Sequence, residues 1–233
     1  MCGLFFVKIL RILHAGEKMR TRKKKWATSE LENNQLILHN ENLRNENEYA
    51  NRLSEIFGDT KPIHLELGCG KGRFVIEMSK RFPDINFVAI ERDETILATA
   101  ARRAREQSAG SIVFIHADVN NGLQFIKKGE ISRLYINFCD PWSRKKKWAK
   151  RRLTHDTFLE IYENLGIPEL HFKTDNRILF ESSLESLSRR GWLMQNISLN
   201  LHASGFEENI MTEYEEKFSP HGPIYRLEAE VRG

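Results

Sequence analysis

From residue 62 onward, short apolar runs alternate regularly with longer segments of helical periodicity. The apolar runs predict buried strands at 63–67, 86–91, 111–117, 134–138 and 169–174. Helices are predicted at about 72–81, 94–107, 154–164 and 177–189. Because consecutive parallel strands need a crossover that is usually a helix, this alternation predicts an α/β fold with a mostly parallel sheet and helices on both faces. Two further runs predict antiparallel strands that complete a seven-stranded sheet, at 192–201 and 224–231.

The first sixty residues follow a different pattern. Residues 20–26 form a basic cluster that ends in Trp26, and residues 33–51 are rich in Asn and Glu but poor in apolar residues. The second stretch is typical of a weakly structured arm, or of a helix with little core. A chain of 233 residues fits one medium-sized domain. We therefore predict a basic and polar arm over 19–60 and a single domain over 61–233.

Several classes of protein are disfavoured by what the sequence lacks. The apolar start at residues 1–18 is interrupted by Lys8 and Arg11 and has no small-residue cleavage site, so we predict no secretion. No apolar run approaches the ~20 residues of a membrane span. Three scattered cysteines indicate a reducing cytosol, and no HExxH or CxxC spacing suggests a metal site. These observations predict a cytoplasmic protein without a membrane or metal partner.

A glycine-rich segment follows the first predicted strand of the alternating region. It reads Glu66-Leu-Gly-Cys-Gly-Lys-Gly72, which places Gly68 and Gly70 in a GxGxG spacing directly after a carboxylate. Glycine allows sharp turns and close approach of the backbone to a ligand. The dinucleotide fingerprint is one residue longer, and an acid beside the loop would repel a pyrophosphate. An acid suits the cationic sulfonium and amino group of S-adenosylmethionine, so the spacing favours that cofactor over NAD.

Two more acids follow successive strands. Glu91 ends the second strand of this region, where a carboxylate can accept hydrogen bonds from ribose hydroxyls. Asp118 follows the third strand, where it could meet the adenine amino group or simply cap the helix that begins after it. Together with Glu66 and the glycine loop, these acids predict a cofactor site at the carboxyl edge of the sheet.

The loop after the fourth strand joins an acid to a dense basic run. Asp140 follows an apolar segment and precedes Trp142, and the cations that come next are Arg144, Lys145, Lys146, Lys147, Lys150, Arg151 and Arg152. Open α/β sheets place their chemistry at strand ends, and cations interleaved with tryptophan suit a polyphosphate backbone with exposed bases. This combination suggests an enzyme acting on nucleic acid. The alternative is a solvated basic loop after an ordinary strand.

Specific motifs make the chain resemble the bacterial tRNA (guanine-N7)-methyltransferase family. The motifs that carry the resemblance are Glu66-Leu-Gly-Cys-Gly-Lys-Gly72, Asn137-Phe-Cys-Asp-Pro-Trp142, Lys150-Arg-Arg-Leu153, His171-Phe-Lys-Thr-Asp-Asn176, Thr212-Glu-Tyr-Glu-Glu-Lys-Phe218 and Pro223-Ile-Tyr225. The resemblance runs from residue 19 to the end of the chain, so residues 1–18 are expected to be an extension outside the family, with Met19 as the true start. It implies a Rossmann-like class I methyltransferase fold, S-adenosylmethionine as cofactor and tRNA as partner. The expected reaction is methylation of N7 of guanine 46 in the variable loop of tRNA. The chain is compatible with either a monomer or a homodimer.

The resemblance also implies roles for individual residues. Asp140 is expected to act in catalysis and to belong to the cofactor site, and Arg144 and Asp175 are expected to bind the substrate. The further substrate residues implied are Thr212, Glu213, Tyr214 and Glu215. The spacing Thr212-x-x-Glu215 also fits a helix capping box. The expected RNA contacts are the cations Lys145, Lys146, Lys147, Lys150, Arg151 and Arg152.

Chemistry independently favours Asp140 as the residue that faces the base. N7 of guanine carries a lone pair at neutral pH, so methyl transfer needs alignment and charge stabilisation but no general base. A carboxylate near the ring stabilises the developing positive charge and accepts the N1–H and N2–H donors of guanine. Trp142 could stack on the base or pack under the loop. Cys139 suggests a covalent mechanism only weakly, because no activating base is evident beside it.

Two departures from the family pattern and two rival functions stay open. Ser143-Arg144 replaces the usual Pro-Lys, and the basic run is one residue longer than usual, with Lys147-Trp148 where a histidine is expected. The rival functions are methylation of another RNA or a protein, and non-catalytic RNA binding on the same fold. A non-catalytic protein would have no need for Glu66, Glu91, Asp118 and Asp140 together.

Overall fold

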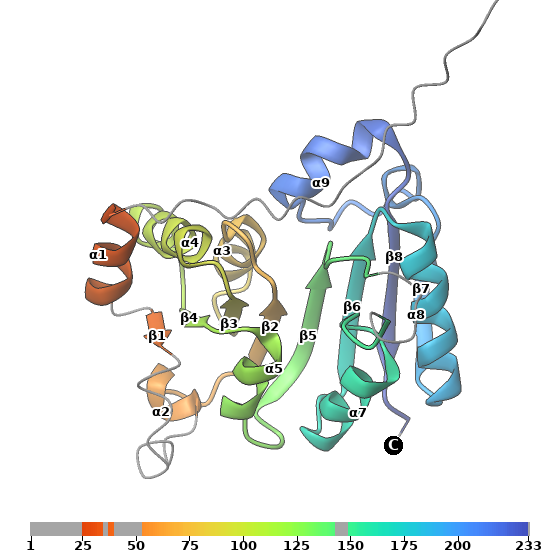
Figure 1. The fold of residues 1–233 in the computed structure, drawn as a ribbon, viewed down its shortest axis with the longest axis horizontal. Helices are drawn as coiled ribbons and strands as arrows, with labels where there is room; N and C mark the ends of the chain where they lie inside the picture. The colour runs from red at the N-terminus through yellow and green to blue at the C-terminus, as the bar shows by residue number, and fades with distance from the viewer. Residues whose placement is uncertain (1–24, 35–36, 40–52, 143–148, 233) are drawn as a thin grey trace, which may run out of the picture.

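The computed structural model describes residues 25–34, 37–39, 53–142 and 149–232. Eight strands form one sheet in the order β1-β4-β3-β2-β5-β6-β8-β7 (Figure 1). β8 runs antiparallel to both of its neighbours, and the other paired strands are parallel. The strands are β1 Ile37–His39, β2 Ile63–Leu67, β3 Asn86–Glu91, β4 Ile112–His116, β5 Ile131–Asn137, β6 Glu169–Thr174, β7 Leu193–Ser198 and β8 Tyr225–Glu230.

Helices cover both faces of this sheet, which separates two hydrophobic cores. The helices are α1 Lys25–Asn33, α2 Leu53–Phe57, α3 Arg73–Arg81, α4 Glu94–Glu106, α5 Val119–Gly122, α7 Asp156–Asn164, α8 Arg177–Arg189 and α9 Glu213–Phe218, with short 3-10 turns at Leu123–Phe125, Leu201–Ala203 and Ser219–His221. The core on one face includes buried residues of α7 and α8, and the core on the other face includes residues of α1, α3 and α4. Within the described ranges, no helix is long and apolar enough to cross a membrane.

The predicted α/β fold is confirmed, and the seven predicted strands all form. The additional strand is β1, which pairs with β4 at one edge of the sheet. α1 and β1 belong to the predicted arm over 19–60, and their residues Ala27, Leu31 and Ile37 are buried. Most of the stretch 33–51 lies outside the described residues. β5 begins at Ile131, three residues earlier than predicted, because Ser132 and Arg133 interrupt the apolar run without ending the strand. The predicted extension at 1–18 lies outside the described residues.

One glycine fixes how the first crossover packs. Gly72 precedes α3 with φ +81°, a left-handed conformation that favours glycine. A Cβ on Gly72 would lie 2.9 Å from Cβ of Ala100 in α4. The glycine therefore lets α3 and α4 approach each other closely beside the carboxyl end of β2.

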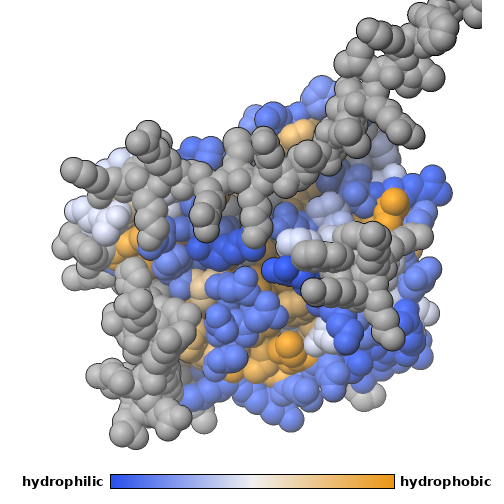
Figure 2. Space-filling view, viewed as in Figure 1, coloured by the Kyte–Doolittle hydropathy of each residue, from blue (hydrophilic) through white to orange (hydrophobic). Residues whose placement is uncertain are grey.

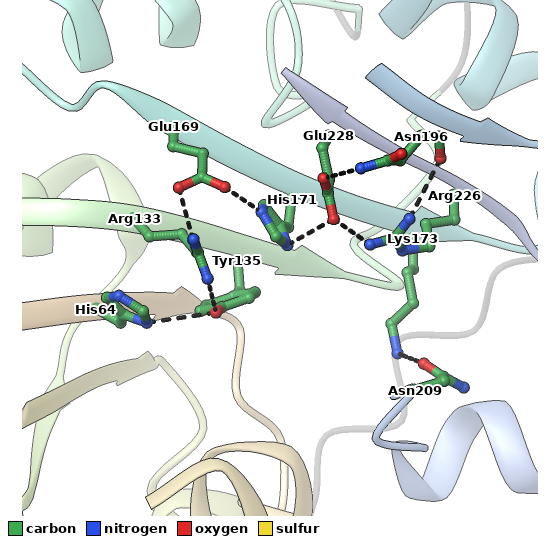
Figure 3. Close-up of polar contacts among 10 residues, drawn as sticks. All are labelled: His64, Arg133, Tyr135, Glu169, His171, Lys173, Asn196, Asn209, Arg226 and Glu228. Atoms are coloured by element: carbon green, nitrogen blue, oxygen red, sulfur yellow. Dashed lines mark hydrogen bonds and ion pairs between the residues drawn. The ribbon is translucent and has the colours of Figure 1, made fainter. Parts of the chain in front are cut away.

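Part of one sheet face is polar rather than apolar. Beyond α3, one side of β5, β6 and β8 carries the half-buried or buried residues Arg133, Glu169, His171, Arg226 and Glu228 (Figure 3). These groups bind one another: Nε of Arg133 donates to Oε2 of Glu169 at 2.7 Å, and Nε2 of His171 lies 2.5 Å from Oε1 of Glu169. His171 also lies 3.6 Å from Glu228, which pairs with Arg226. A hollow of about 360 Å³ lies over this face. The charged groups that line it neutralise one another through the pairs just described.

Candidate functional site

A cleft of about 260 Å³ lies at the carboxyl ends of the central strands. Its lining includes Gly68 after β2, Glu91 at the end of β3, Asp118 after β4 and Asp140 after β5. The structure thus brings together four of the residues predicted from the sequence. Figure 2 shows the face with α5 and α7: among the coloured residues hydrophilic ones predominate, and hydrophobic ones are visible where Figure 1 places α5, β5 and α7.

The glycine loop is fastened to the end of β3. The amide of Gly68 donates to the carbonyl oxygen of Ile90 at 2.8 Å, and the amide of Gly70 donates to Oε2 of Glu91 at 3.1 Å. Gly68 and Gly70 have φ of +75° and +58°, and a Cβ on either would meet no atom within 4 Å. The loop therefore borders open space on the side where a ligand could approach its backbone.

Glu91 is held rigidly at this junction. Besides the amide of Gly70, its carboxylate accepts hydrogen bonds at Oε1 from the amides of Arg92 at 2.9 Å and Asp93 at 3.0 Å. A carboxylate has about four acceptor positions, so one position stays open to a ligand donor. This fixed acid fits the predicted ribose contact.

Asp118 caps a helix and also lines the cleft. Its Oδ1 accepts hydrogen bonds from the backbone amide of Asn120 at 3.1 Å and from Nδ2 of Asn120 at 2.7 Å, which caps α5. The same side chain lines the cleft. The cap therefore fixes the carboxylate at the cleft wall rather than removing it from the site.

Glu66 lies apart from the cleft lining. It alternates along β2 with Leu65 and Leu67, which belong to the core of the opposite face, and its side chain is only 3% exposed. Oε1 of Glu66 accepts a hydrogen bond from Nδ2 of Asn137 at 3.0 Å, whereas Oε2 is buried without a partner among the described residues. Burial raises the pKa of Glu66 to about 7, although the bond from Asn137 opposes this. An unsatisfied buried acceptor next to the glycine loop is suited to a cationic donor from a ligand.

Asp140 is the most exposed acid of the cleft. Its Oδ2 lies 3.9 Å from Nη2 of Arg92, and its carbonyl oxygen accepts a hydrogen bond from the amide of Trp142 at 2.9 Å. The guanidinium carbon of Arg151 lies 4.2 Å from the centre of the Trp142 ring, a cation–π contact. An acid, an aromatic ring and an arginine thus share one side of the cleft. Arg92 had not been predicted as a site residue.

The cations predicted to contact RNA divide into different groups. Lys150 and Arg151 are exposed, whereas Arg144, Lys145, Lys146 and Lys147 lie outside the described residues. Arg152 corrects the prediction because its side chain is 4% exposed: Nε donates to the carbonyl oxygen of Trp142 at 2.6 Å, and Nη1 donates to Oγ of Ser182 at 2.7 Å. Its position assigns Arg152 to holding the loop against α8.

The predicted substrate residues near α9 are also divided. Oγ1 of Thr212 accepts a hydrogen bond from the amide of Glu215 at 3.0 Å, so the capping interpretation is confirmed for Thr212. Glu213 forms an ion pair with Arg103 of α4. The hydroxyl of Tyr214 donates to Oδ2 of Asp175 at 3.1 Å, and both residues are exposed.

Glu215 does not reach the surface, which corrects its predicted contact with substrate. Its side chain is 0% exposed, and its Oε2 lies 2.7 Å from Nζ of Lys173 in β6. Lys173 had not been predicted as a site residue. A signal was present in the sequence, because a lysine inside the predicted strand 169–174 must find an internal partner when that strand is buried.

Cys139 does not offer a nucleophile. Burial and the charge of Asp140 raise the pKa of the Cys139 thiol to about 12, so it stays protonated at neutral pH. Among the described residues, no group of three His, Cys, Asp or Glu side chains is arranged to hold a metal ion.

Comparison with known proteins gives consistent results. A family model described as "Putative methyltransferase" matches residues 60–227. The tRNA (guanine-N(7)-)-methyltransferase of Listeria welshimeri is 46% identical over 215 residues, which cover 91% of this chain and 98% of the relative. The enzyme of the same description from Bacillus subtilis is 44% identical over 217 residues, covering 92% of this chain and 100% of the relative.

Solved structures of more distant methyltransferases share the fold. An antibiotic-related methyltransferase superposes with a TM-score of 0.56 at 16% identity, covering 78% of this chain and 92% of that one. A 16S rRNA (adenine(1408)-N(1))-methyltransferase from Catenulisporales acidiphilia, solved with its cosubstrate SAM, superposes with a TM-score of 0.52 at 13% identity and covers 80% and 91% of the two chains. At these identities the likeness concerns the fold alone.

Proposed function

Because the chain belongs to the tRNA (guanine-N7)-methyltransferase family, we propose that it transfers the methyl group of S-adenosylmethionine to N7 of guanine 46 in the variable loop of tRNA. The observation that carries this proposal is the cleft, where Glu91 and Asp118 lie beside Asp140, Trp142 and Arg151. Acids suited to a nucleoside cofactor thus adjoin an acid, an aromatic ring and a cation suited to a nucleotide. A tRNA substrate implies a cytoplasmic location.

The residues present fit S-adenosylmethionine. Glu91 would bind the ribose, Asp118 the adenine amino group, and the unpaired Oε2 of Glu66 the cationic amino group. The open space beside Gly68 and Gly70 leaves room for the ligand against the loop backbone. When bound, this cofactor supplies an electrophilic methyl group on a sulfonium.

The chain's own contribution to the reaction is alignment and electrostatics. N7 of guanine attacks the methyl carbon as the carbon–sulfur bond breaks, and no proton has to be removed to create this nucleophile. Asp140 stabilises the positive charge that moves onto the purine and accepts its N1–H or N2–H donors. Trp142, with Arg151 against its ring, offers a surface on which the base can stack once it has left its own stack.

Asp175 and Tyr214 form the second part of the base site. The hydrogen bond from Tyr214 orients the Asp175 carboxylate at the end of β6. Burial and the charge of Asp175 raise the pKa of Tyr214 to about 12, so the hydroxyl keeps its proton and remains a donor. Exposed Lys150 and Arg151 contact the tRNA backbone in this proposal, together with Lys145, Lys146 and Lys147. Arg144 binds the substrate guanine in it. Thr212 and Glu213 support the site from α9.

The test is to incubate the protein with methyl-labelled S-adenosylmethionine and unmodified tRNA, then digest the RNA and identify the labelled nucleoside. We expect N7-methylguanosine, and no label in a matched tRNA in which guanine 46 is replaced by adenine. Label at another guanine would contradict the assigned position, and label on another base or on ribosomal RNA would contradict the assigned substrate. Binding of tRNA without any transfer would favour a non-catalytic role.

A further inference from the structure

Lys173 brings a charged group into the interior at the edge of the proposed site. Its side chain is 8% exposed, and its Nζ donates three hydrogen bonds: to Oδ1 of Asn209 at 3.0 Å, to the carbonyl oxygen of Ile210 at 3.0 Å and to Oε2 of Glu215 at 2.7 Å (Figure 3 shows the bond to Asn209). An ammonium group has three donors, and all three are used. Every acceptor comes from residues 209–215, so one strand side chain gathers this whole segment.

The carboxylate of Glu215 is also fully engaged, because its second oxygen has partners of its own. Oε1 of Glu215 accepts a hydrogen bond from Nδ2 of Asn209 at 2.6 Å and lies 3.1 Å from Nε2 of His202. Burial lowers the pKa of Lys173, while the charge of Glu215 opposes this. Removing one member of a buried pair leaves an uncompensated charge, so the loss of either Lys173 or Glu215 alone should strongly destabilise this segment.

This anchor determines where α9 begins. Glu215 lies in the first turn of α9, and Figure 1 shows the helix above the carboxyl ends of β5 and β6. Neighbouring acids tie the same turn to the elements that follow the glycine loop: Glu213 pairs with Arg103 of α4, and Glu216 pairs with Arg73 of α3. Tyr214 lies between these anchors and donates to Asp175.

The other side of Lys173 leads toward the cofactor residues. Lys173 pairs in register with Asn137 of β5, and Asn137 donates to Glu66 of β2. A polar line thus crosses three adjacent strands from Glu66 to Glu215, ending on one side at an unpaired carboxylate oxygen and on the other at α9.

We propose that Lys173 is a positioning residue for methyl transfer: its buried ammonium fixes residues 209–215 and the start of α9. It thereby holds Tyr214 in its hydrogen bond to Asp175 and in ring contact with Phe138 of the cleft lining, at 5.1 Å between ring centres. The expected effect on methylation rests on the proposed function. The anchoring of residues 209–215 rests on the contacts alone. Glu215 acts in it through Lys173 rather than by touching the substrate.

The experiment compares a single with a double variant. Lys173→Met leaves Glu215 charged and buried, so we expect a lower Tm and lower activity. Adding Glu215→Gln removes the unpaired charge, and replacing buried ion pairs by neutral groups often restores stability. We expect the double variant to regain most of its Tm, while kcat for tRNA methylation stays about 100-fold below wild type, because misplacement of about 1 Å can have that effect. The affinity for S-adenosylmethionine, measured by calorimetry, should stay within about twofold.

A matched control is available at the opposite end of α8. Arg190 pairs with Glu163 there, and the double variant Arg190→Met with Glu163→Gln should change Tm without lowering kcat. Full recovery of kcat together with Tm in the Lys173 double variant would reduce Lys173 to a stabilising role and overturn the proposal.

Hydrogen exchange separates this proposal from the proposed function. We expect the amides of residues 209–216 to exchange faster in the Lys173 double variant and unchanged in the control. Unchanged exchange would overturn the anchoring whatever the protein methylates. Faster exchange in a protein that leaves tRNA unmethylated would instead overturn the proposed function and retain the anchor.

Discussion

At the scale of single residues, Asp140 and Glu66 have opposite environments although both are strand-end acids. Asp140 is exposed beside Arg92, whereas Glu66 is buried with one oxygen unpaired. An exposed acid can approach a substrate, and a buried one can recognise only a ligand that enters the interior. The two residues therefore lead to different experiments.

Replacing Asp140 by Asn keeps the size of the side chain but removes its charge. We expect kcat to fall by about 100- to 1,000-fold, the usual effect of removing one group that stabilises transition-state charge. Affinity for S-adenosylmethionine should change much less. Single-turnover kinetics with saturating tRNA measure the chemical step. A variant that retained wild-type kcat would show that this carboxylate does not face the reacting base.

Glu66 should make cofactor binding depend on pH. With its pKa raised to about 7, the side chain is largely protonated below that pH in the free protein. A cationic ligand group favours the carboxylate, so binding releases a proton and the affinity rises as the pH increases from about 5.5 to 7. Calorimetry in two buffers of different ionisation enthalpy counts the protons released. Glu66→Gln should abolish the release, and a persistent release in that variant would assign it to another group.

The position of a residue in the site was predictable from the sequence where strand order alone sets it. It was not predictable where tertiary packing decides whether the side chain is buried or exposed. The spacing of Glu91 and Asp118 after successive strands was enough to bring them to one cleft. Arg152 and Glu215 carry the same charges as their exposed neighbours, and only tertiary packing buries them. Lys173 remained unassigned because its partner is 42 residues away along the chain.

At the scale of elements, the adjacent residues Arg151 and Arg152 make different contacts with Trp142. Arg152 binds the carbonyl of Trp142 and Ser182 of α8, whereas Arg151 lies against the Trp142 ring at the cleft. Adjacent arginines in one loop thus allow a direct comparison of a binding role with a structural one.

Arg151→Gln should weaken tRNA binding and reduce the slope of log Kd against log salt concentration by roughly 0.7–0.9, the effect of one lost phosphate contact. Arg152→Gln should leave that slope unchanged and lower the free energy of unfolding by about 1–3 kcal/mol, because buried acceptors lose their donors. Filter binding over a salt series and thermal melts measure the two effects. Equal slopes in the two variants would mean that both arginines have the same role.

Element boundaries were predictable where hydrophobic periodicity was strong. α8 spans the predicted residues, and β2, β3 and β6 match their predicted ranges. β1 could not be predicted from Ile37–His39 alone, because a strand of three residues has too short a pattern and depends on β4 for its hydrogen bonds.

At the scale of the whole molecule, two buried groups oppose each other as the pH changes. Burial, with the charge of Arg133, lowers the pKa of His64 to about 4, so His64 destabilises the fold as the pH falls from about 6.5 to 4. The pKa of Glu66 is raised to about 7, so Glu66 stabilises the fold as the pH falls from about 7 to 4.5. These contributions have similar size and opposite sign.

We therefore expect the free energy of unfolding to change little between about pH 7 and 4.5 and to fall steeply below that. In the lower range Glu169 adds to His64: burial raises its pKa, but bonds from His171 and Arg133 outweigh this and lower it to about 2. Urea titrations across this range test the balance. His64→Gln should make stability rise as the pH falls toward 4.5, and Glu66→Gln should make it fall. The same trend in both variants would contradict the assignment.

The strand order has a consequence for biosynthesis. β8, which ends at Glu230, lies between β6 and β7 rather than at an edge. During synthesis, the residues of β7 therefore leave the ribosome before those of β8, their neighbour in the sheet. The edge of β6 likewise stays unpaired until β8 has emerged. Loss of β8 would remove a strand from inside the sheet and leave β7 without a partner, rather than shorten the sheet at its edge. A stop codon before Tyr225 should thus produce chains that are degraded rather than a slightly shortened enzyme.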